Sequence, residues 1–272
     1  MLWLIPIGLG MGVYGTMFGV GGGFLIVPVL LWLYPDMEAA TVVSAALIVV
    51  ASNAASGSAA YAWQRRIDFR SGLWLAGASL PGAALGTLAV REVDRGAFEV
   101  VFAAALLLVG VYMIAWRGPR TLRPVATSWG TVRRNIRDRK GETYSYGYRL
   151  QVALLANAGI GFFSSFLGIG GGFIQMPFMI VRLHFPVHIA TATSLFLVGS
   201  TALAGAVAHI AAGDLGWDVS LARAAVLSAS AVTGAQLGAL WSPRVRAELT
   251  TRIFSLVVIA VAAALLGGLI ID

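Results

Sequence analysis

The sequence predicts an all-α polytopic membrane protein made of two homologous halves. Of its 272 residues, 58% are hydrophobic and 11% are charged, and the mean hydropathy is +0.84. A soluble domain carries about a quarter charged residues. The first basic residue is Arg65, so a long N-terminal stretch has no basic side chain. This pattern suits hydrocarbon, because a charge at the bilayer centre costs at least ~2.5–3.5 kcal/mol.

An internal repeat divides the chain. When the sequence is shifted by 149 positions, eight residues between Gly10 and Pro28 fall on identical residues of the second half. The pairs are Gly10 with Gly159, Gly12 with Gly161, Gly19 with Gly168, Gly21 with Gly170, Gly22 with Gly171, Gly23 with Gly172, Phe24 with Phe173, and Pro28 with Pro177. We therefore expect a first membrane repeat at 1–116, an Arg-rich linker at 117–149 and a second membrane repeat at 150–272.

Each half contains one long apolar run that is interrupted by glycines, followed by three apolar runs. The three later runs have about the 20 residues that a membrane-spanning helix needs. The runs are 2–34, 39–63, 71–90 and 97–116 in the first half, and 150–182, 188–212, 220–241 and 250–271 in the second. The interrupted runs are either kinked spanning helices or re-entrant hairpins, because consecutive glycines disfavour a continuous helix.

The basic residues favour the re-entrant arrangement. If both interrupted runs return to the side they entered from, the halves are inverted, and 16 of the 19 basic residues lie in the cytoplasm. If both runs cross the membrane, the halves are parallel and the number is 13. Cytoplasmic loops are enriched in Lys and Arg. We therefore expect inverted repeats in a bacterial or archaeal inner membrane, with the linker, which holds nine basic residues, in the cytoplasm.

The glycine interruptions are the predicted binding site. A broken helix within the membrane has backbone groups that only protein or a water-filled cavity can satisfy. The helices that start at Gly23 and Gly172 would present free N–H groups and the positive end of the helix dipole to an anion. Paired broken helices of this kind form the substrate site in transporters with inverted repeats. Close packing of helices is the other interpretation of such glycines.

Polar residues near the interruptions complete the prediction. Hydroxyl and amide groups can donate to anionic oxygens without a fixed charge, although they also bond back to their own helix. Gln175 has Ile26 as its counterpart in the first half, and this asymmetry suits an anion with one polar end. The candidate substrate-binding residues are Gly21, Gly22, Gly23, Phe24, Ser44, Ser52, Asn53, Gly170, Gly171, Gly172, Phe173, Gln175, Thr193, Ser194 and Thr201. His209, inside a predicted span, is a candidate for proton coupling or a structural histidine.

Other function classes lack support in the sequence. There is no cysteine, and the only lysine, Lys140, lies in the linker, so no Walker lysine follows a glycine cluster. We find no paired carboxylates or zinc-ligand spacing, and predict neither enzyme activity nor a cofactor or metal site. The net charge of +7 is concentrated in the linker, which membrane topology explains without nucleic acid.

The duplicated motif carries a resemblance. Gly19-Val-Gly-Gly-Gly-Phe-Leu-Ile-Val-Pro28 and Gly168-Ile-Gly-Gly-Gly-Phe-Ile-Gln-Met-Pro177, each followed by a Ser/Thr-bearing apolar run, resemble the sulfite exporter TauE/SafE family. The resemblance implies a secondary transporter of a small sulfur-containing anion such as a sulfonate or sulfite. We expect an exporter, and the duplicated broken helices lead us to expect that it works by alternating access. A channel-like facilitator remains an alternative, as does a protein whose basic loop binds lipid or a cytosolic partner. The expected partners are the anion and the lipid bilayer, and the oligomeric state stays open, with a homodimer as one alternative.

Overall fold

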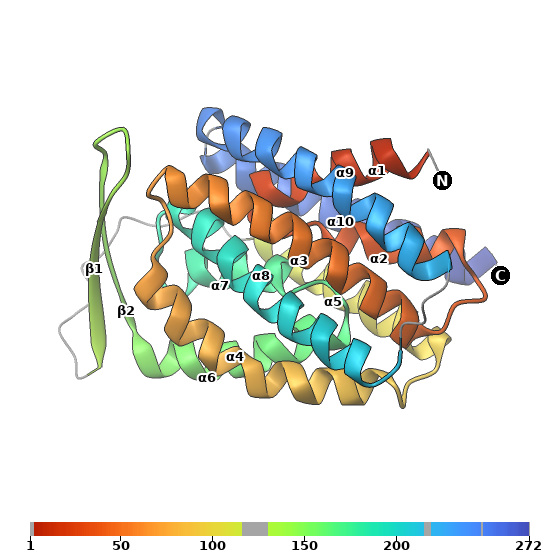
Figure 1. The fold of residues 1–272 in the computed structure, drawn as a ribbon. Helices are drawn as coiled ribbons and strands as arrows, with labels where there is room; N and C mark the ends of the chain where they lie inside the picture. Colours follow the sequence, from red (N-terminus) through yellow and green to blue (C-terminus); the bar gives the residue numbers. More distant parts are fainter. Residues whose placement is uncertain (1–2, 116–129, 215–218, 246, 272) are drawn as a thin grey trace.

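The computed structural model describes residues 3–115, 130–214, 219–245 and 247–271. The described part of the chain is mostly helical, with one β-hairpin that separates the two halves in the sequence and lies at one end of the molecule (Figure 1). The first half contains α1 (Leu4–Met17), α2 (Gly23–Leu33), α3 (Ala39–Trp63), α4 (Phe69–Val90) and α5 (Arg95–Ala115). The second half contains α6 (Leu150–Phe166), α7 (Gly172–Val181), α8 (Val187–Ala211), α9 (Val219–Trp241), the short 3-10 helix η1 (Ser242–Arg244) and α10 (Ala247–Ile271).

The protein is a helical multi-pass membrane protein. By length and composition, five helical segments among the described residues can cross a bilayer: α3, α4, α5, α8 and Ala222–Arg244. Their outer surfaces are apolar, and Leu108 on α5 is 72% exposed. The predicted span at 250–271 coincides with α10, but some side chains at the ends of this helix lie outside the described residues.

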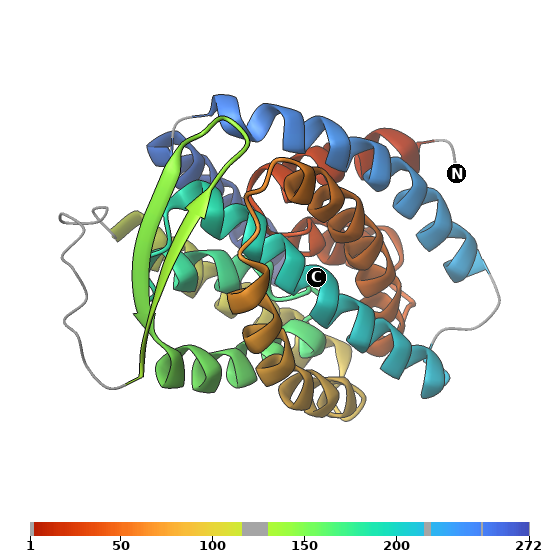
Figure 2. The ribbon, with the colours of Figure 1, turned by 60° about the vertical axis from the view of Figure 1, so that its left-hand side comes forward.

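Helices from the two halves pack in pairs. The long helices α3 and α8 lie side by side in the middle of the molecule, α1 packs along α9, α4 along α6, and α5 along α10 (Figures 1 and 2). Each pair takes one helix from each half, so the halves share one core. In Figure 1, α3 runs from right to left while α8 runs from left to right, and α4 and α9 are opposed in the same way.

Two glycine-rich segments break the helices. The first break, residues 18–22, separates α1 from α2, and the second break, residues 167–171, separates α6 from α7. Each contains three glycines with a positive φ, a conformation that residues with a side chain rarely adopt. These are Gly19, Gly21 and Gly22 (φ 71°, 76° and 82°) and Gly168, Gly170 and Gly171 (φ 69°, 71° and 75°). The sequence prediction of interrupted helices that restart at Gly23 and Gly172 agrees with these elements.

The second part of the predicted linker is folded. β1 (Thr131–Arg137) and β2 (Thr143–Arg149) form an antiparallel hairpin in which Asn135 pairs with Ser145. Alternate β2 residues face the helices, and the rings of Tyr146 and Tyr148 contact Phe185, which follows α7. Residues 131–149 of the expected linker thus form a folded hairpin, while residues 117–129 lie outside the described part.

Candidate functional site

The two breaks touch each other in the interior. A Cβ on Gly23 would come within 2.6 Å of the Cα of Ile169, in the second break. A Cβ on Gly172 would overlap the backbone of Val20, in the first. These two contacts are equivalent under the 149-residue shift. The glycines therefore allow the backbones of the two breaks to approach more closely than any side chain would permit.

Side chains from the central helices bind the carbonyl groups of the breaks. Nδ2 of Asn53 on α3 donates to the carbonyl oxygen of Gly21, and Oγ1 of Thr201 on α8 donates to that of Gly170, both at 3.1 Å. Ser194 on α8 also donates to the Gly19 carbonyl oxygen at 2.7 Å. Three predicted site residues thus reach the breaks, and in this structure they donate to backbone carbonyls.

The helices that leave the breaks begin with unpaired amides. Gly22 and Gly171 are the N-caps of α2 and α7, and both lie in the left-handed region. Within the described parts of the chain, no hydrogen bond leaves the backbone N–H of the next two residues of either helix. Phe24 and Phe173 are fully buried at these starts. Two positive helix ends therefore lie in the interior, as an anion site at the breaks requires.

A small polar cavity lies beside the second break, between α4, α6, α7 and α8. Its volume is about 10 Å³, which is close to the space one water molecule needs. Gly170, Gln175 and Thr201, all predicted site residues, line it. The rest of its lining is Ser79, Asn157, Ile160, Ser164, Leu197 and Val198. None of these nine residues carries a charge.

Two buried amides in this cavity have unpaired atoms. Gln175 is 3% exposed and Asn157 is 1% exposed. Nε2 of Gln175 and Oδ1 of Asn157 have no hydrogen-bond partner in the structure. The sequence reasoning missed Asn157, Ser79 and Ser164. An asparagine within an apolar run was the available signal for Asn157, because polar amides are rarely buried without a reason.

Other predicted residues do not line the cavity. Ser44 donates to the carbonyl oxygen of Thr41 at 2.9 Å and Ser52 to that of Ile48 at 2.8 Å, so both bond to their own helix. Oγ1 of Thr193 accepts a hydrogen bond from the backbone N–H of Asp68 at 3.0 Å. Thr193, which lies on α8, therefore contacts the start of α4, near the hairpin.

His209 belongs to a charged cluster in the last turn of α8. Its Nδ1 lies 2.7 Å from Oδ2 of Asp214, and Nε of Arg91 donates to Oδ1 of the same carboxylate at 2.9 Å. The imidazole is fully buried, whereas Arg91 is exposed. The repeat counterpart of His209 is Tyr61, whose hydroxyl donates to the carbonyl oxygen of Thr16 in the last turn of α1 at 2.9 Å. An imidazole thus occurs at this position only in the second half.

The β-hairpin covers one end of the second half. The Asp68 carboxylate, the N-cap of α4, accepts hydrogen bonds from Arg134, from the Ser71 amide at 3.1 Å and from the Tyr146 hydroxyl at 2.8 Å. Burial alone would raise the pKa of Asp68, but these hydrogen bonds outweigh it and hold the pKa below its ordinary value. Tyr146 and Tyr148 share an apolar cluster with Leu197, which lines the cavity.

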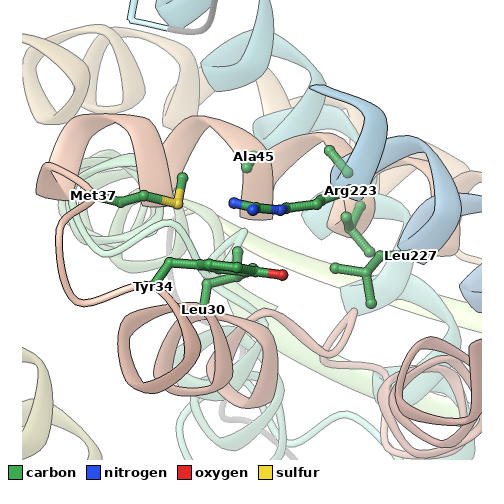
Figure 3. Close-up of a pocket in the computed structure, with 8 residues that line it drawn as sticks. Leu30, Tyr34, Met37, Ala45, Arg223 and Leu227 are labelled. Carbon is green, nitrogen blue, oxygen red and sulfur yellow. The ribbon is translucent and has the colours of Figure 1, made fainter. Parts of the chain in front are cut away.

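A second small cavity lies between helices of the two halves, and no residue of the breaks lines it (Figure 3). It is lined by residues of α2, α3 and α9 and by the turn after α2, and the guanidinium carbon of Arg223 lies 3.8 Å from the ring centroid of Tyr34. Figure 3 shows the Arg223 side chain extended over that ring, with Met37 and Leu227 at either end. Its lining contains none of the predicted site residues. The cavity beside the second break is the candidate site because predicted site residues line it.

Comparison with known proteins agrees with this architecture. Residues 4–265 match the family described as Sulfite exporter TauE/SafE. The chain is 28% identical over 269 residues to the "Probable membrane transporter protein YunE" of Bacillus subtilis, covering 97% of this chain and 96% of that one. It is 30% identical over 264 residues to a "Probable membrane transporter protein" of Xylella fastidiosa (strain Temecula1), covering 95% and 93% of the two chains.

A more distant relative is archaeal. The "Probable membrane transporter protein MJ0441" of Methanocaldococcus jannaschii is 25% identical over 246 residues, which cover 86% of this chain and 84% of that one. No solved structure matches the chain. The family match covers both breaks, both central helices and the hairpin between them. This multi-pass membrane protein is a transporter and belongs to the sulfite exporter TauE/SafE family.

Proposed function

We propose that the protein is a secondary transporter that exports a small sulfur-containing anion, such as a sulfonate or sulfite, and binds it at the paired helix breaks. The family description and the names of the relatives support transport as the function. The anion, its direction and the residues that bind it are the parts that we propose.

One observation carries the proposal. Two helix N-termini with unpaired amides meet at the breaks, and the adjacent cavity is lined by neutral side chains only. The amides and dipoles attract an anion, and the absence of a fixed positive charge lets it leave again. Neutral donors and helix dipoles attract an anion more weakly than a buried lysine or arginine would, which favours its release.

We further propose an alternating-access mechanism between inverted halves, 1–116 and 150–272, with residues 117–149 on the cytoplasmic side of the inner membrane. Corresponding helices run in opposite directions in Figure 1, as inverted repeats require. The cavity has a volume of only about 10 Å³, and this small size favours a carrier with a closed state over an open channel. His209, bound to Asp214, is the proposed proton-coupling residue.

Counterflow in proteoliposomes tests this function. Vesicles loaded with unlabelled sulfite, sulfoacetate, taurine or chloride receive a labelled sulfur anion outside, and a carrier should show uptake stimulated by its own substrate inside. Gly171→Val should abolish exchange, because Gly171 adopts a φ of 75° in the second break. Gly159→Ala is the control, because nothing lies within 4 Å of a Cβ at this position. Exchange that is equal in both variants would contradict the site, and saturable flux without trans-stimulation would indicate a facilitator.

A further inference from the structure

We propose that a cavity at the turn of the β-hairpin binds the headgroup of an anionic phospholipid, such as phosphatidylglycerol, through the side chains of Arg65, Arg137 and Arg139. This headgroup pocket is separate from the helix breaks, and binding there does not depend on which substrate is transported. Four features of the described residues support a lipid site: the size and charge of the pocket, the state of Asp138, the backbone of Arg65 and the position of Trp63.

The headgroup pocket lies between the turn that joins α3 to α4 and the turn that joins β1 to β2. Trp63 and Arg65 line it from the first turn, and Arg137 and Arg139 line it from the second. The backbone N–H of Arg139 donates to the carbonyl oxygen of Gln64 at 3.1 Å, so the two turns are bound to each other. The volume of the pocket is about 700 Å³, which is within the range of small-ligand sites and can hold a lipid headgroup.

Three arginines give the headgroup pocket its charge. Within the described residues, no ion pair involves the side chain of Arg65, Arg137 or Arg139. A guanidinium group presents a planar set of N–H donors that matches the oxygens of a phosphate. The pocket therefore offers several unpaired cations to one anionic group.

The one carboxylate in the lining, that of Asp138, is occupied by the fold. Its Oδ2 accepts a hydrogen bond from Nη2 of Arg66 at 3.2 Å, and the Asp138 side chain is fully buried. Its Oδ1 accepts from the backbone N–H groups of Lys140 and Glu142, at 2.9 Å and 3.0 Å. Asp138 thus holds the turn of the hairpin together, and Arg66 balances its charge. The three other arginines leave the pocket positive.

The backbone of Arg65 adopts a conformation that usually belongs to glycine. Arg65 is the second residue after α3 and has a φ of 58°, whereas Gly213 occupies the equivalent position after α8 with a φ of 79°. In both turns the next backbone N–H bonds five residues back, to the carbonyl oxygens of Tyr61 and His209, both at 3.1 Å. Glycine suits such a turn best, because a Cβ disfavours a positive φ. The strained arginine therefore indicates a role for its side chain beyond the turn itself.

Trp63 places the headgroup pocket at the surface of the membrane. It ends the spanning helix α3 and is 67% exposed, and Trp241, at the end of α9, is 51% exposed. Gln64 joins the two helix ends by donating from Nε2 to the carbonyl oxygen of Ala239, and Figure 2 shows the hairpin turn beside them. Tryptophans at the ends of spanning helices lie at the level of the lipid headgroups.

The arginines of the pocket lie at the same level. The guanidinium carbon of Arg139 is 3.6 Å from the ring centroid of Trp63. A guanidinium that stacks on a ring keeps its N–H edge for a phosphate. Basic pockets on the cytoplasmic side of spanning helices bind anionic headgroups in this way. The position beside Trp63 therefore favours a lipid over a soluble phosphate compound.

Lipid titration of the full-length protein in a nonionic detergent tests this site. The three probes are phosphatidylglycerol, zwitterionic phosphatidylcholine, and glycerol 1-phosphate, which has a phosphate without acyl chains. The measurements are the midpoint of thermal unfolding at each concentration, since a ligand of the folded state raises it, and the number of retained lipids by native mass spectrometry. We expect one tightly retained phosphatidylglycerol per chain, and binding of the other two probes that is about tenfold weaker or less.

Arg65→Gly separates lipid binding from folding. Glycine removes the strain at this position, so the unfolding midpoint without lipid should equal or exceed that of wild type, while phosphatidylglycerol binds about fivefold more weakly. Arg137→Gln should weaken phosphatidylglycerol by a similar factor. Arg133→Gln is the matched control, because Arg133 is an exposed arginine of the same hairpin that does not line the pocket. Its affinity should stay within about twofold of wild type.

Each contrary result overturns a defined part of this site. Equal affinities of Arg65→Gly, Arg137→Gln and Arg133→Gln for phosphatidylglycerol would show that the pocket is not where the lipid binds. A lower unfolding midpoint of Arg65→Gly without lipid would assign Arg65 to the fold rather than to a ligand. Glycerol 1-phosphate that binds as tightly as phosphatidylglycerol would assign the pocket to a soluble phosphate compound, and equal binding of phosphatidylcholine would overturn the selection by charge.

Discussion

Asn53 on the central helix α3 donates a hydrogen bond from Nδ2 to the carbonyl oxygen of Gly21, at 3.1 Å, and so holds the first break against the centre of the molecule. Thr201 on α8 makes the equivalent bond to Gly170 in the second break. Both donors are nearly fully buried. Each break is thus bound by a polar side chain from the central helix of its own half, in matching positions of the repeat, and Ser194 of α8 also binds the first break.

Removal of this bond should destabilise the fold. Asn53→Ala leaves the Gly21 carbonyl without its side-chain donor, and a buried unpaired acceptor costs about 1–3 kcal/mol. We expect a lower midpoint of thermal unfolding in detergent. Ser52→Ala is the matched control, because the Ser52 hydroxyl bonds only to its own helix at Ile48. A midpoint that falls equally in the two variants would show that the Asn53 bond has no special role.

The contact between the breaks should not tolerate a methyl group. Gly23→Ala would place a Cβ against the backbone of Ile169. Neither backbone segment can move away without shifting a helix. We expect loss of most correctly folded protein, measured as monodisperse yield after purification. Gly10→Ala lies in the same half with open space around its Cβ position, and should express and fold normally. Normal yield of Gly23→Ala would contradict the observed packing of the two breaks.

Docking of the hairpin should depend on the charge of Asp68. The partners of Asp68 lower its pKa. Its contribution to the stability of the docked hairpin is therefore complete above pH 3.8, the ordinary pKa of the group, and is lost as the pH falls below that value. We expect hydrogen exchange in β1 and β2, corrected for the intrinsic effect of pH, to accelerate in that range.

Replacement of Arg134, the basic partner of Asp68, should accelerate hydrogen exchange in the hairpin at neutral pH. Arg134→Met removes the guanidinium that binds Asp68, and hydrogen bonds to charged groups contribute about 1.5–3 kcal/mol. Arg133→Met, which changes the exposed neighbouring residue of β1, is the control. If hydrogen exchange in the hairpin is the same in both variants, and the same above and below pH 3.8, the Asp68 cluster does not stabilise the docked hairpin.

Proton coupling at His209 predicts a pH-dependent rate. His209→Gln keeps a polar side chain that cannot titrate, and should flatten the dependence of exchange on pH between about 5 and 8. His184→Asn, which alters an exposed histidine outside the helices, should leave the profile as it is. A His209→Gln profile with wild-type shape and a lower unfolding temperature would instead assign His209 to structure.

The main outline of the fold could be read from the sequence because hydrophobic runs and repeated glycines are local signals. The apolar runs predicted the long helices, and the glycine clusters predicted where α2 and α7 begin. The hairpin was missed because its strands are rich in arginine, and topology alone explains such charge. Alternation of Tyr144, Tyr146 and Tyr148 was the signal that indicated a strand with one buried face.

The candidate site could be predicted only in part. Gln175 and Thr201 were found because they lie next to the repeated motif, or at repeated positions, whereas Asn157 and Ser79 come from helices that the motif does not include. Whether a serine faces a cavity or its own helix depends on its rotation about the helix axis and on the neighbouring helices. Ser44 and Ser52 show this, since both bond to carbonyls of their own turn.

The most direct test of anion transport at the second break is counterflow of labelled sulfite in proteoliposomes, comparing wild type, Gln175→Leu and Ile26→Leu. We predict exchange in wild type and Ile26→Leu that is stimulated by internal sulfite, and a reduction of about tenfold or more in Gln175→Leu with normal reconstitution. Equal exchange in all three proteins would contradict binding at this cavity, and the absence of exchange in wild type would contradict sulfite transport itself.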